Sequence, residues 1–179
     1  MVRSAVIRLG TGCILVAGLA VSLVAIPARA QAQAMSGINA RDACTSLNQA
    51  AIEEALGAKF KNSKVTTPAR RGVSTCAWIP ATPKSHMSLT VTTYSQEAIK
   101  GTNQRNLRDY YESLKANHTQ VAGKPAQVFP RVGKHTSYFP GISKGADAIL
   151  VLRDDSIVIM GVAGINRDQA LKLAEAAAR

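Results

Sequence analysis

The chain has 179 residues, of which 22 are Lys or Arg and 11 are Asp or Glu, so its formal charge at pH 7 is +11. This length suits one domain with a single hydrophobic core. The sequence contains no internal repeat, low-complexity block or long linker, which excludes repeat and multi-domain architectures.

The first thirty residues have the parts of a Sec-type secretory signal. Residues 1–8 carry two cations and no acid, and residues 14–26 are apolar except for one Gly and one Ser. Ala28 and Ala30 then form an A-x-A cleavage site. The apolar run is shorter than the roughly 20 residues of a membrane-spanning helix, and no later segment approaches that length. The pattern predicts a periplasmic or secreted bacterial protein with a soluble mature chain.

Cys13 precedes the apolar run, whereas a cysteine that carries a lipid anchor follows it. We therefore expect Cys13 to be removed with the signal. Cleavage near Ala30 also removes three arginines and no acid, which leaves 19 basic and 11 acidic residues and a formal charge of +8. The expected organisation is a signal at 1–30, a flexible lead-in at 31–40 and a single α+β domain at 41–179.

The first predicted element of this domain is a helix at about 49–56. Asn48 can cap its start, and Gly57 is a natural terminator. Leu47 and Ile52 occupy the two positions of a hydrophobic staple.

Three strands are predicted after this helix. In "AKFKNSKV", Lys59 and Lys61 point outward around an inward Phe60, as in a half-buried strand. In "VSTCAWIP", Cys76 and Trp78 share one face, and prolines end the strand. "MSLTVTTY" has a similar alternation, so the last two runs are expected to be antiparallel neighbours.

A long polar helix is predicted next. Ser95 can cap "QEAIK", and Gly101 weakens the middle of the helix. The apolar face follows the helical spacing and consists of Leu107, Tyr110, Tyr111 and Leu114. A tyrosine pair can bind sugars or a partner, but packing against a sheet is the commoner arrangement and is expected here.

The rest of the chain reads as sheet and a closing helix. "AQVFP" and "HTSYFPG" are predicted short strands broken by proline, and "DAILVLRDDSIVIMGVAG" is a predicted hairpin in the middle of the sheet. Asn166 and Gln169 form a capping-box pattern before the last helix, in which Leu171, Ala174 and Ala177 can pack inward. Because hairpins join most strands, the sequence predicts an α+β fold with an antiparallel sheet.

Without the signal, the chain has two cysteines, Cys44 and Cys76. An isolated pair in an oxidising compartment favours a structural disulfide over two separate buried thiols. A catalytic or metal-binding role is less favoured, because no C-x-x-C and no further ligands lie nearby.

The basic residues are clustered. Residues 59–71 hold five cations and no anion, and residues 113–146 hold five more, again with no acid. Such stretches can bind polyanions such as lipopolysaccharide or acidic cell-wall polymers, or they can form a solvated surface that keeps the protein soluble. No nucleic-acid motif accompanies the charge, so a nucleic-acid partner is not expected. The candidate ligand-binding residues are Lys59, Lys61, Arg70, Arg71, Lys134 and His135.

The sequence carries no catalytic signature. His86, His118 and His135 are scattered without an H-E-x-x-H motif, and Ser137 lacks the context of a nucleophile elbow. We therefore predict no catalytic residue, no metal and no cofactor, and we do not expect an enzyme.

The segments "DACTSLNQAAIEEALG", "STCAWIP" and "SLTVTTY" resemble the first half of the DUF3558-type exported proteins, which have a Mog1/PsbP-like fold. "VGKHTSYFPG", the hairpin and the closing helix resemble the ending of that family, so the resemblance covers about residues 40–178. It implies a curved antiparallel sheet flanked by helices, with Cys44 bonded to Cys76. Relatives act mainly as lipoproteins or extracellular sensor modules, and the resemblance implies no shared catalytic residues.

The chain departs from this family in two ways. It lacks a cysteine after the apolar run for a lipid anchor, and Lys134 and His135 stand where an acidic residue is common. The favoured hypothesis is a non-enzymatic binding or sensor-like module whose sheet concavity or basic face holds an anionic envelope component. The alternatives are an envelope hydrolase on the same fold, or a structural or assembly partner of envelope proteins that uses the helix with Tyr110 and Tyr111.

Overall fold

A seven-stranded antiparallel sheet forms the framework of the protein, with strand order β1-β2-β3-β7-β6-β5-β4. The structure is a computed structural model that describes residues 42–64, 71–82, 86–133 and 135–179. The predicted signal and lead-in lie outside these residues. The α+β class with an antiparallel sheet is confirmed. The strands are β1 (Phe60–Lys64), β2 (Val73–Pro80), β3 (Ser88–Ser95), β4 (Gln127–Val128), β5 (Thr136–Ser143), β6 (Ala146–Leu152) and β7 (Ser156–Ala163).

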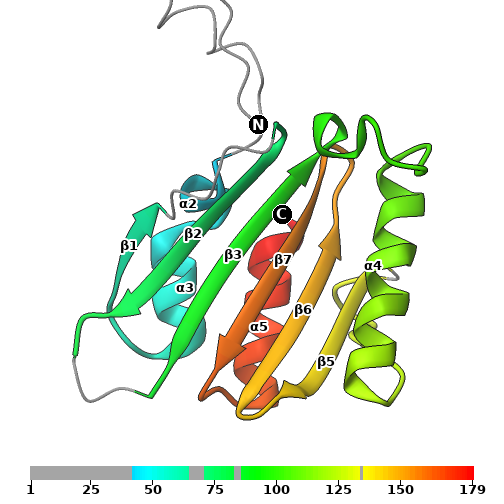
Figure 1. Ribbon diagram of the computed structural model, residues 1–179. Helices are drawn as coiled ribbons and strands as arrows, with labels where there is room; N and C mark the ends of the chain where they lie inside the picture. The colour runs from blue at the N-terminus through cyan, green and yellow to red at the C-terminus, as the bar shows by residue number, and fades with distance from the viewer. Residues whose placement is uncertain (1–41, 65–70, 83–85, 134) are drawn as a thin grey trace, which may run out of the picture. The chain divides into compact units, whose positions relative to one another are not determined.

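Helices pack on both faces of this sheet. Figure 1 shows α2, α3 and α5 behind the sheet and α4 in front of it. The short 3-10 helix η1 follows β3 directly. The bounds are α2 (Ala43–Ser46), α3 (Gln49–Leu56), η1 (Gln96–Ile99), α4 (Leu107–Ala122) and α5 (Arg167–Ala178).

Each face of the sheet has its own core. Behind the sheet, α2, α3 and α5 cover buried strand residues that include Cys76, Trp78, Leu89, Val91 and Met160. In front, α4 and η1 cover a smaller core made by Ile99, Leu107, Tyr111, Phe139, Leu150 and Ile157. β6 and β7 are covered on both sides, which explains their nearly continuous apolar sequence and confirms their predicted place in the middle of the sheet.

Local sequence signals set most of the element ends. The side chain of Asn48 accepts a hydrogen bond from the backbone N of Ala50 at the start of α3, and Gly57 ends this helix with φ +66°. Asn166 and Gln169 form the predicted capping box of α5. These features are confirmed, as are the hairpin of β6 and β7 and the antiparallel pairing of β2 with β3.

The prediction of one long helix after β3 is wrong, because the structure has η1 and α4 as separate elements. The hydroxyl of Thr102 donates to the backbone O of Ile99 (2.7 Å) at the end of η1. The α4 helix then starts at its own cap, where the Asn106 side chain accepts from the backbone N of Asp109 (2.8 Å). Gly101, with φ +81°, lies in the connection rather than inside a helix.

The predicted proline break in β5 is also wrong, because the strand continues through Pro140 to Ser143. The pairing of β5 with β6 shifts register between Phe139 and Ser143. A proline fits such a bulge because it has no N–H to donate to the ladder. The backbone N of Gly141 instead donates to the side chain of Asp147 (2.7 Å).

The first helix is tied covalently to the second strand. Cys44 of α2 and Cys76 of β2 form a disulfide with a Cα–Cα distance of 5.1 Å, which confirms the predicted bond. Next to it, the hydroxyl of Ser74 accepts a hydrogen bond from the backbone N of Ala43 (3.0 Å). A four-residue helix has little stability alone, so these contacts determine where α2 lies.

Arg153 ties the turn between β6 and β7 to the ends of two helices. Its Nε donates to the backbone O of Ala177 in α5, and its Nη2 donates to the backbone O of Ser46 in α2 (3.1 Å). The last carbonyls of a helix have no partner within it and carry partial negative charge. Arg153 therefore satisfies carbonyl oxygens that come from distant parts of the chain.

Replacing both disulfide cysteines with serine is expected to lower the free energy of unfolding by about 3 to 4 kcal/mol, because the bond closes a loop between residues 32 positions apart. Guanidinium unfolding of the wild type and of the Cys44→Ser/Cys76→Ser variant measures the difference. Reductant should destabilise the wild type and leave the variant unchanged. Equal stability of the two proteins would contradict a structural role for the bond.

Replacing Arg153 with methionine is expected to lower the free energy of unfolding by about 1.5 to 3 kcal/mol, because hydrogen bonds to a charged group are lost. The matched control is Arg105→Met. Arg105 is an exposed arginine whose ion pair with Asp109 lies on the surface of α4, so its removal should cost less than about 1 kcal/mol. Equal losses in both variants, measured by thermal unfolding, would show that Arg153 is not a special link.

Candidate functional site

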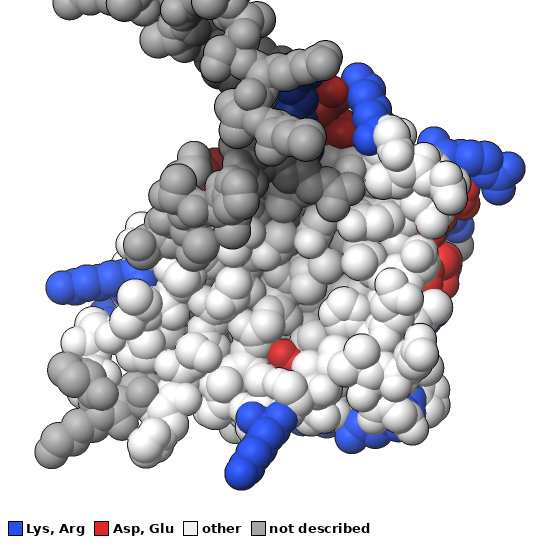
Figure 2. Space-filling model, in the orientation of Figure 1, with Lys and Arg blue, Asp and Glu red and all other residues white. Residues whose placement is uncertain are grey.

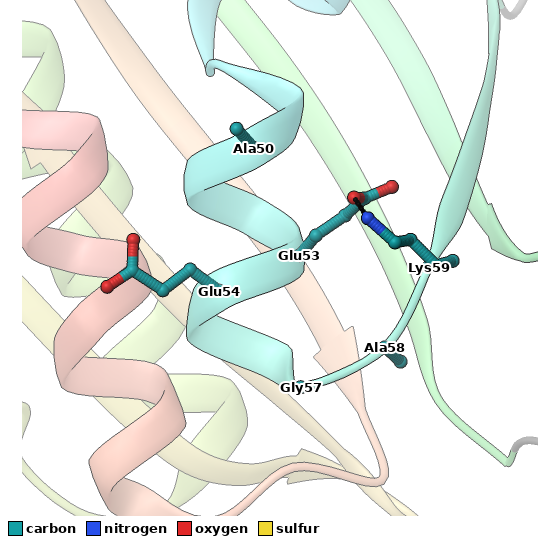
Figure 3. A pocket seen from close by; sticks show the side chains of 6 residues that line it. All are labelled: Ala50, Glu53, Glu54, Gly57, Ala58 and Lys59. Carbon is teal, nitrogen blue, oxygen red and sulfur yellow. Dashed lines mark hydrogen bonds and ion pairs between the residues drawn. The ribbon is translucent and has the colours of Figure 1, made fainter.

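Lys59, a predicted ligand-binding residue, is paired with a carboxylate. Its Nζ lies 2.7 Å from Oε2 of Glu53 (Figure 3). The other carboxylate oxygen, Oε1, accepts hydrogen bonds from Nε2 of Gln49 (3.0 Å) and from the backbone N of Phe60 (3.2 Å). These bonds join α3 to the start of β1. The charge of Lys59 is therefore compensated within the protein.

The same group of bonds changes the acidity of Glu53. The hydrogen bond from Lys59, then that from Gln49 and then that from the backbone of Phe60 lower the pKa of Glu53 from 4.5 to about 2. The hollow of about 370 Å³ beside α3 is lined by Glu53, Glu54 and Lys59 among others, and Figure 3 shows Glu54 pointing away from the ion pair. The lining combines acidic and basic side chains, so this hollow does not gather the positively charged groups that an anion would need.

The remaining predicted ligand residues do not come together. Arg70 and Lys134 lie outside the described residues. Lys61 is exposed on β1, and Arg71 lies before β2, at the other end of that strand from the start of β1. The eight residues of β2 correspond to about 26 Å of extended chain. His135 precedes β5, five strand positions from β1 or about 24 Å. One small ligand cannot contact all of these residues.

The sheet face itself is the second location that the sequence suggested for a ligand. In the described part of the chain, α4 reaches the front of β3 at Tyr94, whose ring contacts Tyr110, and no α-helix packs on the rest of the front of β1, β2 and β3. Uncharged side chains alternate outward on this open part of β2 and β3: Thr75, Ala77, Ile79, Thr90 and Thr92. Figure 2 shows Lys and Arg side chains around the edge of the visible part of this face. These side chains of β2 and β3 are uncharged, and Lys61 lies on this face at the edge strand β1, opposite Ile79.

A polar hollow of about 350 Å³ lies where α4 starts, and we call it the α4 hollow. Four segments meet there: η1, the cap of α4, the residue before β5, and the turn between β6 and β7. Its lining residues are Gln96, Asn106, Leu107, Arg108, His135, Leu152, Arg153 and Asp154. Among the predicted ligand residues that the structure describes, His135 is the one in this hollow.

Arg108 and His135 contact each other in the α4 hollow. Nη2 of Arg108 lies 3.2 Å from Nε2 of His135. A guanidinium can only donate, so Nε2 of the ring accepts and carries no proton in this contact. The backbone O of His135 also accepts from the backbone N of Leu152 (3.0 Å), which fixes the residue beside β6. The guanidinium has five N–H donors and uses one of them on the ring.

The charges around the hollow favour an anion. Arg108 and Arg153 contribute two positive charges, and Asp154 contributes one negative charge. The nearby Asp109 is paired with Arg105, whose Nε lies 3.1 Å from its carboxylate. Arg108 is also the second residue of α4, and a helix start carries positive potential. A carboxylate or phosphate group fits this combination of donors.

His86 is exposed, whereas His118 and Ser137 are used in packing. Nδ1 of His118 lies 2.8 Å from the backbone O of Leu114 in the same helix, and its ring contacts Phe139. The hydroxyl of Ser137 is buried and lies 2.7 Å from the hydroxyl of Tyr111, which is 1% exposed. Burial, partly offset by this hydrogen bond, raises the pKa of Tyr111. The predicted packing of this tyrosine against the sheet is confirmed.

Comparisons with known proteins add no assignment. A scan against protein-family models and searches of curated proteins and solved structures found no match to this chain. Within the described ranges, no three His, Cys, Asp or Glu side chains are placed to hold a metal ion. None of the helices in those ranges has the length and hydropathy that a membrane crossing requires.

Sequence reasoning missed Arg108. The residue lies 27 positions before His135, and no local pattern links the two. The available signal was the asparagine two positions earlier, because an N-cap at Asn106 places the next residues at a helix start. That signal was hidden by the expectation that the helix had already begun at Ser95.

Acid is expected to remove stability that depends on Glu53. The pKa of Glu53 is lower in the folded chain than its ordinary value of 4.5, so its contribution is fully present above pH 4.5 and is lost as the pH falls toward about 2. Glu53→Gln should therefore narrow the difference between urea midpoints measured at pH 6 and pH 2.5. Glu54→Gln, one residue along α3, is the control and should keep the wild-type difference. An unchanged pH dependence in Glu53→Gln would contradict this role.

Proposed function

We propose that this protein is an exported, non-enzymatic binding module that holds an anionic group of an envelope component in the α4 hollow. The observation that supports this function best is the contact between Arg108 and His135. It holds a guanidinium at a helix start in a hollow that has room for a ligand.

Export is supported by two independent features. The first thirty residues have the charge and hydropathy pattern of a Sec-type signal. The chain also has a disulfide between Cys44 and Cys76, and such bonds persist in oxidising compartments such as the periplasm or the extracellular space. The proposed fold is the Mog1/PsbP-like arrangement of the DUF3558-type exported proteins, with which the seven-stranded antiparallel sheet and its flanking helices are compatible.

The α4 hollow supports anion binding better than the basic stretch at residues 59–71. Lys59 is paired with Glu53, and Lys61 lies on the edge strand β1, five strand positions or about 24 Å from β5. Lysine on an edge strand has an ordinary structural role, since it discourages pairing with other chains. The guanidinium of Arg108, in contrast, uses one of its N–H groups to contact His135, which holds it in position, and has other N–H groups that can bind a ligand. The proposed ligand group is therefore a single carboxylate or phosphate held by a guanidinium.

Replacing Arg108 with glutamine is expected to weaken the binding of inorganic tripolyphosphate about tenfold or more, because hydrogen bonds from a charged donor are worth about 1.5 to 3 kcal/mol. Isothermal titration calorimetry in 50 mM NaCl measures this affinity. Raising the salt to 300 mM should weaken wild-type binding as well, because the hollow is open to solvent.

Two controls carry the same change in charge elsewhere. Lys115→Gln lies further along α4, and Lys61→Gln lies on β1; each should change the affinity less than twofold. If Lys61→Gln weakens binding as much as Arg108→Gln, then the protein binds anions through its overall charge, and the α4 hollow is not the site. If Arg108→Gln leaves the affinity for tripolyphosphate unchanged, the α4 hollow is likewise not the site.

A further inference from the structure

A second hollow of about 280 Å³ lies between the turn after β4 and the first turns of α5, and we call it the α5 hollow. Phe129, Pro130 and Leu171 supply its apolar surface, and Arg131, Arg167 and Asp168 supply its charged groups. It shares no lining residue with the α4 hollow. Apolar surface combined with a few convergent polar groups is the ordinary composition of a small-molecule site.

The apolar wall of this hollow is held in place without a ligand. The ring of Phe129 is buried and stacks on Tyr138, with ring centroids 5.2 Å apart. The hydroxyl of Tyr138 donates to Asp147 (2.6 Å). The backbone O of Phe129 accepts from the backbone N of Val132 (2.9 Å), which closes the turn. A wall fixed in this way loses little entropy when a ligand binds.

The opposite wall is equally independent of a ligand. The α5 helix begins with a complete capping box, in which Asn166 and Gln169 satisfy each other's backbone N–H groups. Nε2 of Gln169 also donates to the backbone O of Leu56 (3.0 Å), which fixes the start of α5 against α3. The position of Arg167 in the first turn follows from these bonds. The capping box occupies the backbone N–H groups of Asn166 and Gln169, and the charged side chains are the groups that line the hollow.

The two arginines of the hollow have no partners in the described part of the chain. No hydrogen bond or ion pair is made there by the guanidinium of Arg131 or of Arg167. Asp168 lines the same hollow but lies beyond ion-pair distance of both. A ligand with an anionic head and an apolar body would complement two unpaired guanidinium groups beside an apolar wall.

We propose that the α5 hollow binds a small amphipathic anion, with its carboxylate or phosphate head between Arg131 and Arg167 and its apolar body against Phe129, Pro130 and Leu171. A volume of about 280 Å³ corresponds to on the order of nine groups the size of a water molecule at about 30 Å³ each. A ligand with an eight-carbon chain therefore fills the hollow. A plain inorganic anion leaves the apolar wall unused, and a neutral lipid leaves both arginines unpaired.

Octyl phosphate is the first probe, titrated into ¹⁵N-labelled protein and followed by amide chemical shifts. The expected shifts cluster at residues 129–133 and 167–171. Octanoate should shift the same amides, which tests the second kind of head group, whereas octanol and inorganic phosphate should bind at least tenfold more weakly there. Shifts of equal size and affinity with octanol, or with inorganic phosphate, would overturn the proposal.

The variants test the same site from the protein side. Arg131→Gln/Arg167→Gln should weaken octyl phosphate binding at least tenfold, while Lys172→Gln, with a similar loss of charge on α5, should change it less than twofold. Asp168→Asn should strengthen binding severalfold, because it removes a carboxylate from beside the head group. Wild-type affinity in the double arginine variant would overturn the proposal.

Two comparisons keep the result interpretable. Arg108→Gln should leave the octyl phosphate shifts at residues 129–133 and 167–171 unchanged, because Arg108 does not line the α5 hollow, so failure of the α4 hollow and failure of the α5 hollow are separate outcomes. Both arginines of the α5 hollow are exposed, and the amide spectrum of the double variant away from the hollow should overlay that of the wild type. The comparison of octyl phosphate with octanol uses the wild type alone, so it decides the proposal even if a variant folds poorly.

Discussion

The bond between Cys44 and Cys76 places the first helix of the described chain on the sheet, and the position of the layer behind the sheet depends on it. α2 has four residues and cannot hold its own position by backbone hydrogen bonds. The disulfide holds its start against β2, and Arg153 holds its end through the backbone O of Ser46. Since α3 follows α2 after two residues, the apolar side of α3 is brought onto β1 and α5 at the same time. Arg153 also donates to the backbone O of Ala177 in α5, so the same side chain links α2 and α5.

The front of the sheet is organised by a different kind of contact. α4 is joined to the sheet through side chains near its start: Arg108 contacts His135, and Tyr111 contacts Ser137 one turn later. The first contact is open to solvent and the second is buried. The solvent-facing contact lines the hollow, and the buried one keeps the helix from moving relative to β5. The candidate site therefore lies where a rigid junction meets water, which is a position that can bind a ligand without a large change in shape.

Much of the fold could be predicted because short-range contacts determine it. Asn48, Gly57, Asn166 and Gln169 act within a few residues of themselves, and the alternation in β2 reports its two faces directly. The break in β5 was predicted wrongly and Arg108 was missed, because contacts outside the local pattern decide both. The backbone of Gly141 bonds to a carboxylate six residues away, so β5 passes through its proline instead of stopping. The pairing of Arg108 with His135 spans 27 residues, and no spacing rule in a single sequence reveals it.

The distribution of charge explains why the basic stretches of the sequence are a poor guide to the site. At physiological salt the interaction between exposed charges falls off over about 8 Å, and β1 lies five strand positions, or about 24 Å, from the strand that His135 precedes. The cations of β1 can attract an anionic surface toward the protein, but they add little to the energy of a ligand already in place. Affinity instead requires a donor that is held in position and free of an internal carboxylate partner. Lys59 has a carboxylate partner within the protein. Arg108 instead contacts the imidazole of His135, which holds the guanidinium in position without neutralising its positive charge. The number of cations in a segment therefore governs long-range attraction, and the contacts of individual cations govern where a ligand is held.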